Sequence, residues 1–240
     1  MLVNSKWKWR ISGKHPSAKD YIIAGKSMPV LEGITKWIEM SYEKIFSKKT
    51  DHSHYHSYRF WMKSPDKHYL ICGLVKDSCD KIGRSYPLTI IGTGYLKYWE
   101  HHLELIPFAC EKTWIQMESI LARNETTIEE FKENLSLIHP PQHDWKNFQF
   151  QKSQNQLSSI DHSFEKNIIY NKNSFIKLLP VTFQDDSLKL PINWHSFLKH
   201  KKKIPNSVFM GGSTKQIMLA AYYRPLDEED FSNLWVQNKQ

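Results

Sequence analysis

Residues 72–94 read CGLVKDSCDKIGRSYPLTIIGTG, and this stretch decides the fold class. It begins inside an apolar run that covers residues 69–75, and a second apolar run, residues 88–91, follows Pro87. Short aliphatic runs bounded by Gly, Pro, Asp and Ser predict buried strands that lie side by side. The connection of about ten residues is longer than a hairpin turn requires, and such connections often carry functional groups.

The residues before this stretch extend the predicted sheet. Residues 58–62 form one strand, a turn with Pro65 at its second position follows, and residues 68–75 return as the next strand. Three strands in close succession predict an antiparallel meander rather than a doubly wound sheet. Residues 6–12 alternate basic and apolar side chains, so we expect a half-buried strand with its tryptophans toward the core.

Three segments have clear helical signals. Residues 29–46 place apolar side chains at three- and four-residue spacings behind Pro29. Thr127 and Glu130 have the spacing of a capping box. The acidic run at residues 227–230 matches the dipole of a final helix that follows it.

The rest of the chain has weaker patterns. We expect helix in residues 95–106, a long loop in residues 142–159, and strands in residues 206–210 and 216–223. These elements together predict an α/β (α+β) fold, a central and largely antiparallel sheet with flanking helices. We expect one domain over residues 1–240, with a subdomain break near 142–160.

The chain is basic, but its charge is dispersed. Lys+Arg 33 against Asp+Glu 25 gives a net charge of +8 over 240 residues. The dense basic run at residues 199–203, KHKKK, is more typical of a solvated loop than of a nucleic-acid site. Nucleic-acid or anion binding through this run and the basic face of residues 6–12 is the alternative function.

Cysteine use and hydropathy indicate the compartment. Cys72, Cys79 and Cys110 are an odd number without metal-ligand spacing, which favours a reducing environment. No run approaches the roughly 20 apolar residues that span a bilayer, and the N-terminus lacks the core of a signal peptide. We expect a cytoplasmic protein without membrane insertion.

Catalytic and metal motifs have little support. His52, His54 and His56 alternate without carboxylate or cysteine support, so we expect exposed loop histidines. Asp77 and Asp80 are close enough to share a cation, but the lysine and arginine in their loop make it a poor metal site. There is no GxSxG elbow and no phosphate-binding loop. We expect no enzyme, no metal, no cofactor and no small-molecule substrate.

Several segments resemble the hallmark motifs of one family. GKHPSAKDY at residues 13–21, YRF at 58–60 and DSCDKIGRSYPLT at 77–89 are similar to the GKLPxxGDF start, the RF strand and the PSVDxVGRxFPLT loop-and-strand of the TagF (ImpM) family. PNSVFMGG at residues 205–212 resembles that family's ending. Lys19 stands where the family pattern has glycine, and Asp77 stands where it has proline.

This resemblance implies a cytoplasmic accessory protein of the bacterial type VI secretion system. Such a protein represses assembly or firing after translation by binding an FHA-domain scaffold component and sometimes membrane-complex proteins. The resemblance also implies an α/β fold with a central, largely antiparallel sheet, and no catalytic activity.

The predicted binding surface consists of two loops, residues 13–20 and 77–86. Their charged residues either hold the loops together or face a partner, and both interpretations stay open. The candidates for partner binding or loop structuring are Gly13, Lys14, Pro16, Asp20, Arg59, Ser78, Asp80, Gly83, Arg84 and Pro87.

Overall fold

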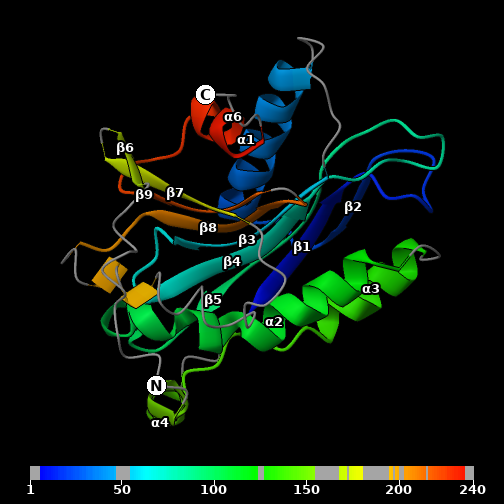
Figure 1. Cartoon of the computed structure of the whole chain (residues 1–240). Coiled ribbons are helices and arrows are strands. Elements are labelled where there is room, and N and C mark those ends of the chain that lie inside the picture. Colours follow the sequence, from blue (N-terminus) through cyan, green and yellow to red (C-terminus); the bar gives the residue numbers. More distant parts are fainter. Residues whose placement is uncertain are drawn as a thin grey trace.

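A nine-stranded antiparallel sheet organises the described part of the chain (Figure 1). The structure is a computed structural model that describes residues 6–46, 55–123, 127–154, 168–171, 173–180, 195–196, 198–199, 203–214 and 216–235. The strand order is β2-β1-β5-β4-β3-β8-β9-β7-β6, and every neighbouring pair is antiparallel. The predicted fold class is confirmed.

The elements have the following bounds. The strands are β1 Lys8–Gly13, β2 Ile22–Gly25, β3 His56–Lys63, β4 Tyr69–Lys76, β5 Leu88–Tyr95, β6 Ile168–Asn171, β7 Ser174–Pro180, β8 Ser207–Ser213 and β9 Gln216–Tyr222. The helices are α1 Pro29–Phe46, α2 Ile106–Leu121, α3 Ile128–Ser136, α4 Trp145–Gln154 and α6 Glu228–Trp235. Two 3-10 turns, η1 Trp99–His101 and η2 Leu103–Leu105, precede α2.

The predicted meander is confirmed as β3, β4 and β5, which are neighbours both in sequence and in the sheet. The predicted capping box is also present: the Thr127 hydroxyl accepts from the Glu130 backbone N–H, and the Glu130 carboxylate accepts from the Thr127 backbone N–H. It satisfies amide donors that the first turn of α3 would otherwise leave without partners.

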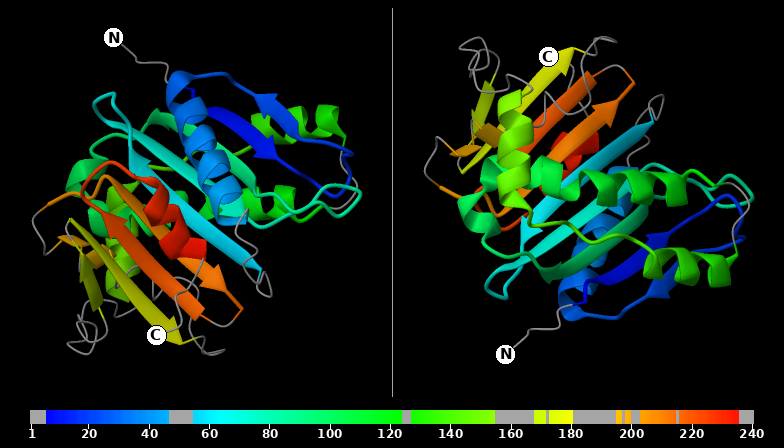
Figure 2. Two further views of the ribbon diagram at one scale, coloured as in Figure 1. Left: turned by 90° about the horizontal axis from the view of Figure 1, so that it is seen from above. Right: turned by 90° about the horizontal axis from the view of Figure 1, so that it is seen from below.

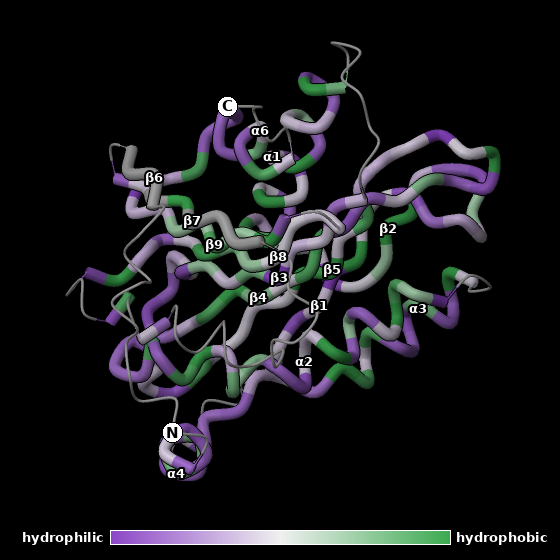
Figure 3. The backbone as a smooth tube through the Cα atoms, viewed as in Figure 1, coloured by the Kyte–Doolittle hydropathy of each residue, from purple (hydrophilic) through white to green (hydrophobic). Residues whose placement is uncertain are grey.

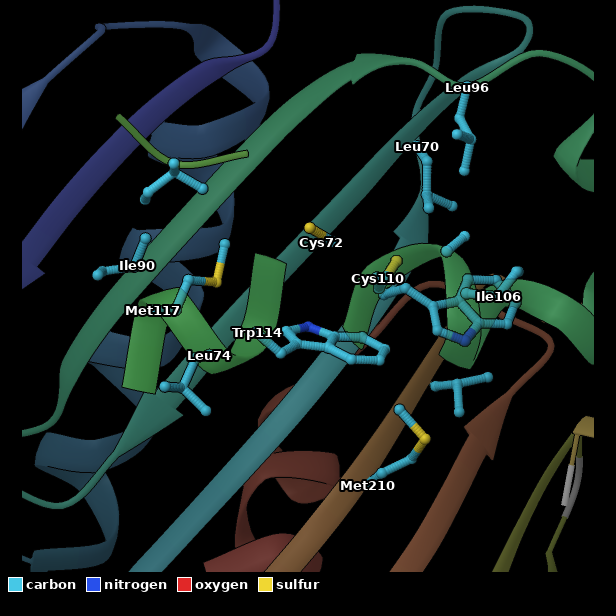
Figure 4. Packing of buried hydrophobic residues seen from close by; sticks show 14 of the residues in the cluster. Leu70, Cys72, Leu74, Ile90, Leu96, Ile106, Cys110, Trp114, Met117 and Met210 are labelled. Carbon is cyan, nitrogen blue, oxygen red and sulfur yellow. The ribbon is translucent and has the colours of Figure 1, made fainter. Parts of the chain in front are cut away.

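Helices cover the sheet on both faces (Figures 1 and 2). On one face, Trp114 and Met117 of α2 pack on Leu74 and Ile90 of the strands (Figure 4). The Trp114 indole N–H donates to the Gly73 carbonyl oxygen at 3.1 Å, which satisfies a polar atom inside this core. Figure 3 shows the hydrophobic positions concentrated along the strands and polar positions in the outer loops and α4.

The other face is covered by α1 and α6. Ile38 and Tyr42 of α1 and Phe231 of α6 are buried against Phe60 and Phe209 of the sheet. The helical period of residues 29–46 therefore describes a face that packs on the sheet. Burying each aliphatic or phenylalanine side chain contributes about 1.5–3 kcal/mol.

Two tryptophans of the N-terminal segment point into the sheet core, as predicted. A Cβ at Gly92 would lie 1.9 Å from the Trp9 ring, and a Cβ at Gly94 would lie 2.6 Å from the Trp7 ring. The two glycines that close the second apolar run therefore leave room for these indole rings. Trp9 is buried and Trp7 is partly buried, so the two rings pack on β5 rather than standing out as a stacking platform for bases.

Two predictions about local structure were wrong. Residues 142–159 were expected to be a loop, but α4 forms there, with Trp145 and Phe148 buried one turn apart. With only two buried apolar residues, the segment had too weak a period to be recognised. Residues 95–106 were expected to be one helix, but β5 continues to Tyr95 and the two 3-10 turns follow. Tyr98 has a left-handed φ of 61°, which interrupts a regular helix.

None of the helices in the described segments has the length and apolar character that crossing a bilayer requires.

Candidate functional site

Gly13 fixes the junction from which two loops leave the sheet. It ends β1 opposite Leu88, the first residue of β5. Its φ is 127°, and a Cβ there would lie 2.0 Å from the Pro87 carbonyl oxygen, so only glycine fits. The first loop (residues 14–20) and the second loop (residues 77–87) therefore leave the sheet at the same end, where Figures 1 and 2 show them side by side.

Asp80 is the buried centre of this site. Its side chain is fully enclosed, yet both carboxylate oxygens have donors. Oδ1 accepts from the backbone N–H of Ile82 at 3.1 Å and of Arg84 at 2.9 Å. Oδ2 accepts from Arg84 Nε at 2.6 Å and lies 3.2 Å from Lys14 Nζ. Two cations and two amide groups thus satisfy one carboxylate, as a buried charge requires.

These contacts determine the protonation state of Asp80. Burial raises the pKa of the carboxyl, but the Arg84 backbone N–H and guanidinium, the Lys14 ammonium and the Ile82 N–H together outweigh it and lower the pKa to about 2. Asp80 is therefore ionised at neutral pH, and its negative charge is held by the loops themselves.

Backbone contacts join the two loops directly. The Lys81 N–H donates to the Ala18 carbonyl oxygen at 2.8 Å, and Arg84 Nη2 donates to the Lys19 carbonyl oxygen at 2.9 Å. The Asp20 carboxylate lies 3.9 Å from Arg84 Nη2 and is 86% exposed, so it adds little to the stability of the site. Arg84 thus binds the second loop through Asp80 and the first loop through a backbone carbonyl.

The outer side of the loop pair is accessible to solvent. Ile82 is 69% exposed at the tip of the second loop, followed by Gly83 with a φ of 85°. The Arg84 side chain remains 52% exposed despite its internal contacts. Pro16 is exposed on the first loop. Arginine is among the residues enriched at protein interfaces, and an exposed isoleucine two positions away in the same loop adds apolar surface that a partner could cover.

One protein family matches a large part of this chain. The family described as "TagF N-terminal domain, Type VI secretion system-associated" matches residues 11–138, more than half of the chain and a range that contains both loops. The chain belongs to the TagF N-terminal domain family. A search of curated proteins finds no match.

A solved structure has the same fold as this TagF-family chain. The crystal structure of PA0076 from Pseudomonas aeruginosa PAO1 is 12% identical, has a TM-score of 0.57, and the alignment covers 97% of this chain and 96% of that chain. At this identity, the likeness concerns the fold alone.

One predicted site residue of the TagF-family chain lies outside the loop pair. Arg59 of β3 donates from Nε and Nη2 to the two carboxylate oxygens of Glu118, at 2.6 and 2.9 Å, and from Nη1 to Glu111 at 2.9 Å. Its guanidinium also lies 5.7 Å from the Trp114 ring centroid. Arg59 therefore ties β3 to α2, and the structure does not bring it to the loops.

The other predicted residues lie in or beside the two loops. The Ser78 carbonyl oxygen accepts from the Tyr86 backbone N–H at 2.9 Å, which closes the base of the second loop. Ser78 as a whole is half-buried. The remaining members of the site are Gly13, Lys14, Pro16, Asp20, Asp80, Gly83, Arg84 and Pro87.

Asp77 faces away from Asp80 and has other partners. Its Oδ2 accepts from the His56 backbone N–H at 2.8 Å and lies 3.1 Å from His56 Nδ1, and its Oδ1 accepts from the Trp235 indole N–H at 2.6 Å. The expectation that His56 is an exposed loop residue was wrong, because it begins β3 and is buried. His52 and His54 lie outside the described residues. In the described ranges, no three His, Cys, Asp or Glu side chains gather as metal ligands.

The alternative basic surface is only partly described. Lys199 binds the buried Glu104, with Nζ and Oε1 2.5 Å apart, and Lys203 lies 5.5 Å from the Tyr223 ring centroid. Residues 200–202 of the basic run lie outside the described residues. The described lysines of the run thus have partners within the chain.

The sequence interpretation missed two features of the loop site. Ile82 was not selected as a contact residue, although an isoleucine inside the otherwise polar run DSCDKIGRS is an available signal. The backbone carbonyls of Ala18 and Lys19 had no such signal, because side-chain patterns do not reveal which carbonyl a distant loop approaches.

Proposed function

We propose that this protein is a non-enzymatic regulator of a type VI secretion system that represses assembly or firing by binding a partner protein in the cytoplasm. The proposed partner is the FHA-domain scaffold component, with other secretion components as further partners. Membership in the TagF N-terminal domain family supports the link to type VI secretion. The observation that supports binding as the mode of action is the exposed tip of a loop pair whose shape is fixed by internal hydrogen bonds and ion pairs.

The loop pair supports docking because its shape is set before any partner arrives. Both carboxylate oxygens of Asp80 accept from donors inside the site, and the Lys81 and Arg84 contacts hold the second loop on the first. A partner that contacts Ile82 and the exposed side of Arg84 then does not have to order the loop. Such preorganisation lowers the entropic cost of association.

The same geometry supports a role without catalysis. A general base works best when its pKa lies near the operating pH. Asp80 has a pKa of about 2 and both oxygens occupied, so it neither holds an exchangeable proton at neutral pH nor faces solvent. Its chemistry suits the positioning of loops.

Capture of the purified FHA-domain component by Ile82→Asp tests the proposal. Ile82 is 69% exposed, so a charge there leaves the fold intact while placing a carboxylate in the interface. We expect affinity to fall about tenfold or more. Leu137→Asp is the matched control, because Leu137 is 68% exposed and follows α3, outside both loops; it should bind as the unchanged protein does.

Arg84→Ala forms a second arm of the experiment. It removes the exposed guanidinium but also one donor of Asp80, so its unfolding midpoint is measured alongside capture. Undiminished capture by both Ile82→Asp and Arg84→Ala would place the binding surface elsewhere. No capture by the unchanged protein would remove the FHA-domain component as the partner.

A further inference from the structure

His15 of the first loop is buried, although the residue that follows it is exposed. It is 1% exposed and lies between Lys14, which pairs with Asp80, and Pro16 at the surface. Its ring meets the Phe131 ring of α3 in a T-shaped arrangement, with centroids 5.0 Å apart and an interplanar angle of 82°. A titratable side chain therefore attaches the first loop to α3.

The hydrogen bonds of the His15 ring determine where its proton lies. Nδ1 accepts from the Ser17 backbone N–H at 3.2 Å and lies 2.8 Å from the Ser17 hydroxyl oxygen. A backbone N–H can only donate, so Nδ1 is the unprotonated nitrogen and the proton of the neutral ring lies on Nε2. Nε2 is buried and has no hydrogen-bond partner among the described residues. These contacts are those of a neutral imidazole.

The same residue fixes the turn from which the first loop reaches the second. The Ala18 backbone N–H donates to the His15 carbonyl oxygen at 2.9 Å, and Pro16 occupies the second position of this turn, which proline favours. The Ala18 carbonyl oxygen then accepts from the Lys81 N–H of the second loop at 2.8 Å. The His15 side chain thus holds a turn whose last residue binds the second loop.

Protonation of the His15 ring is incompatible with these contacts. The second proton would lie on Nδ1, which could then no longer accept from the Ser17 N–H. The resulting cation would also be buried, and a buried charge requires a partner of opposite sign. Protonated His15 therefore favours a first loop that has left its position on α3, where water can reach the ring.

The charged groups around the ring do not supply such a partner. Among the described residues, those that face or flank the ring are Lys14 of the first loop, Lys76 of β4, Arg123 after α2, and Glu130 and Lys132 on either side of Phe131. Four of these are cations, and the carboxylate of Glu130 accepts from the Thr127 backbone N–H at the exposed start of α3.

The balance of these groups favours the neutral ring. Burial lowers the pKa of His15 from its ordinary value of 6.5, the backbone of Arg123 opposes this shift, and the Lys76 ammonium lowers the pKa further. A histidine whose folded pKa is lowered favours the folded arrangement above pH 6.5, and this advantage is lost as pH falls through the folded value. Asp80, with a pKa of about 2, stays ionised throughout that range.

We propose that His15 makes the loop pair sensitive to pH: neutral His15 holds the first loop on α3, and protonation of the ring releases that loop and weakens its bonds to the second loop. The inference concerns the conformation of the chain itself. Only its consequence, weaker docking of a partner at acid pH, rests on the proposed function.

Nuclear magnetic resonance of the full chain between pH 7.5 and pH 5 tests the proposal. At pH 7.5 the His15 nitrogen shifts should show the tautomer with the proton on Nε2. As the ring titrates, the hydrogen-exchange protection of the Ser17, Ala18 and Lys81 amides, corrected for the intrinsic effect of pH, should fall about tenfold or more with the same midpoint. Unchanged protection, or a midpoint that differs from that of the ring, would overturn the proposal.

Two substitutions separate the charge of His15 from its packing. His15→Asn places a carboxamide oxygen where Nδ1 lies, so it still accepts from the Ser17 N–H but does not titrate. Its amides should keep their protection at both ends of the pH range. His15→Phe fills the space of the ring without an acceptor and should show low protection at both ends. Far-UV circular dichroism checks that each variant retains its helices.

His143→Asn is the matched control, because His143 is an exposed histidine before α4 and outside both loops. It should lose protection at acid pH as the unchanged protein does. Persistence of this pH dependence in a folded His15→Asn variant would assign it to another group. Capture of the FHA-domain component at pH 7.5 and pH 6 is measured separately: loops that respond to pH without a change in capture would contradict the proposed docking surface and leave the role of His15 intact.

Discussion

At the scale of single residues, Asp80 explains how two loops without regular secondary structure keep fixed positions relative to each other. Its carboxylate is fully enclosed and accepts from Lys14, Ile82 and Arg84, which belong to both loops. Removing one partner from such a group leaves buried charge without compensation, which costs more than the favourable pairing contributed. The residue thus holds the loop pair in place from inside.

Asp80→Asn is expected to lower the unfolding midpoint at neutral pH, because Lys14 and Arg84 lose their shared negative partner. The pKa of Asp80 is lowered from 3.8 to about 2 in the folded protein, so its contribution to stability is present above the unfolded value and is lost as pH falls toward about 2. The unchanged protein should therefore lose stability between about pH 4 and pH 2, and the variant should lose less there. Urea unfolding across this pH range measures both effects.

Asp20→Asn is the control for this prediction. Asp20 lies 3.9 Å from Arg84 but is 86% exposed, so its removal should change stability by no more than about 0–1 kcal/mol. An Asp80→Asn variant as stable as Asp20→Asn would contradict the role given to the buried carboxylate.

At the scale of elements, Arg59 joins β3 to α2 through two glutamates. It makes a bidentate contact with Glu118 and a single contact with Glu111. Burial raises the pKa of Glu111, while Arg59 opposes this shift. The two carboxylates therefore depend on one guanidinium for their charge compensation.

Arg59→Met is expected to destabilise the fold by roughly 1.5–3 kcal/mol at neutral pH, because hydrogen bonds to charged groups are lost. Without the guanidinium, the pKa of Glu111 should rise further. A carboxyl whose folded pKa is raised favours the folded state at low pH and opposes it as pH rises through that pKa. The deficit of the variant should therefore shrink when the pH is lowered from 7 toward 5, as followed by urea unfolding. Removing Glu111 as well, in Arg59→Met with Glu111→Gln, should abolish this pH dependence; its persistence would mean that another group is responsible.

At the scale of the whole molecule, one sheet joins distant parts of the chain. β3 pairs with β8 over seven residues, from His56 opposite Ser213 to Met62 opposite Ser207. The same strand β3 pairs with β4 of the meander. The N-terminal meander and the C-terminal strands therefore share one continuous hydrogen-bonded surface.

This continuity leads us to predict a single cooperative unfolding transition. Indole fluorescence reports on tryptophans such as Trp114 in one core and Trp235 in the other, and far-UV circular dichroism reports on the helices. If residues 1–240 form one domain, both signals should change with the same midpoint in urea. Two separated transitions would instead support a subdomain break near residues 142–160.

Local sequence patterns determined the elements whose evidence lies within a few residues. Alternation and turn residues predicted β3, β4 and β5, helical spacing predicted α1, and Thr127 with Glu130 predicted the start of α3. The motifs at residues 13–21 and 77–89 also predicted the family. These signals can be read from the sequence alone because they depend on the backbone preferences of nearby residues and on which face of a helix or strand is buried.

Only the tertiary structure decided the contacts between distant residues. The sequence could not place Arg59 on α2 rather than at the loops, pair Asp77 with His56 and Trp235, or select the Lys19 carbonyl as the acceptor of Arg84. The physical reason is that a charged side chain pairs with whatever the folded sheet brings near it, and sequence separation carries no information about that distance. DSCDKIGRSYPLT thus determined that a polar loop joins two buried strands, whereas the fold decided that its Asp80 is enclosed, its Ile82 is exposed and its Arg84 is half-exposed.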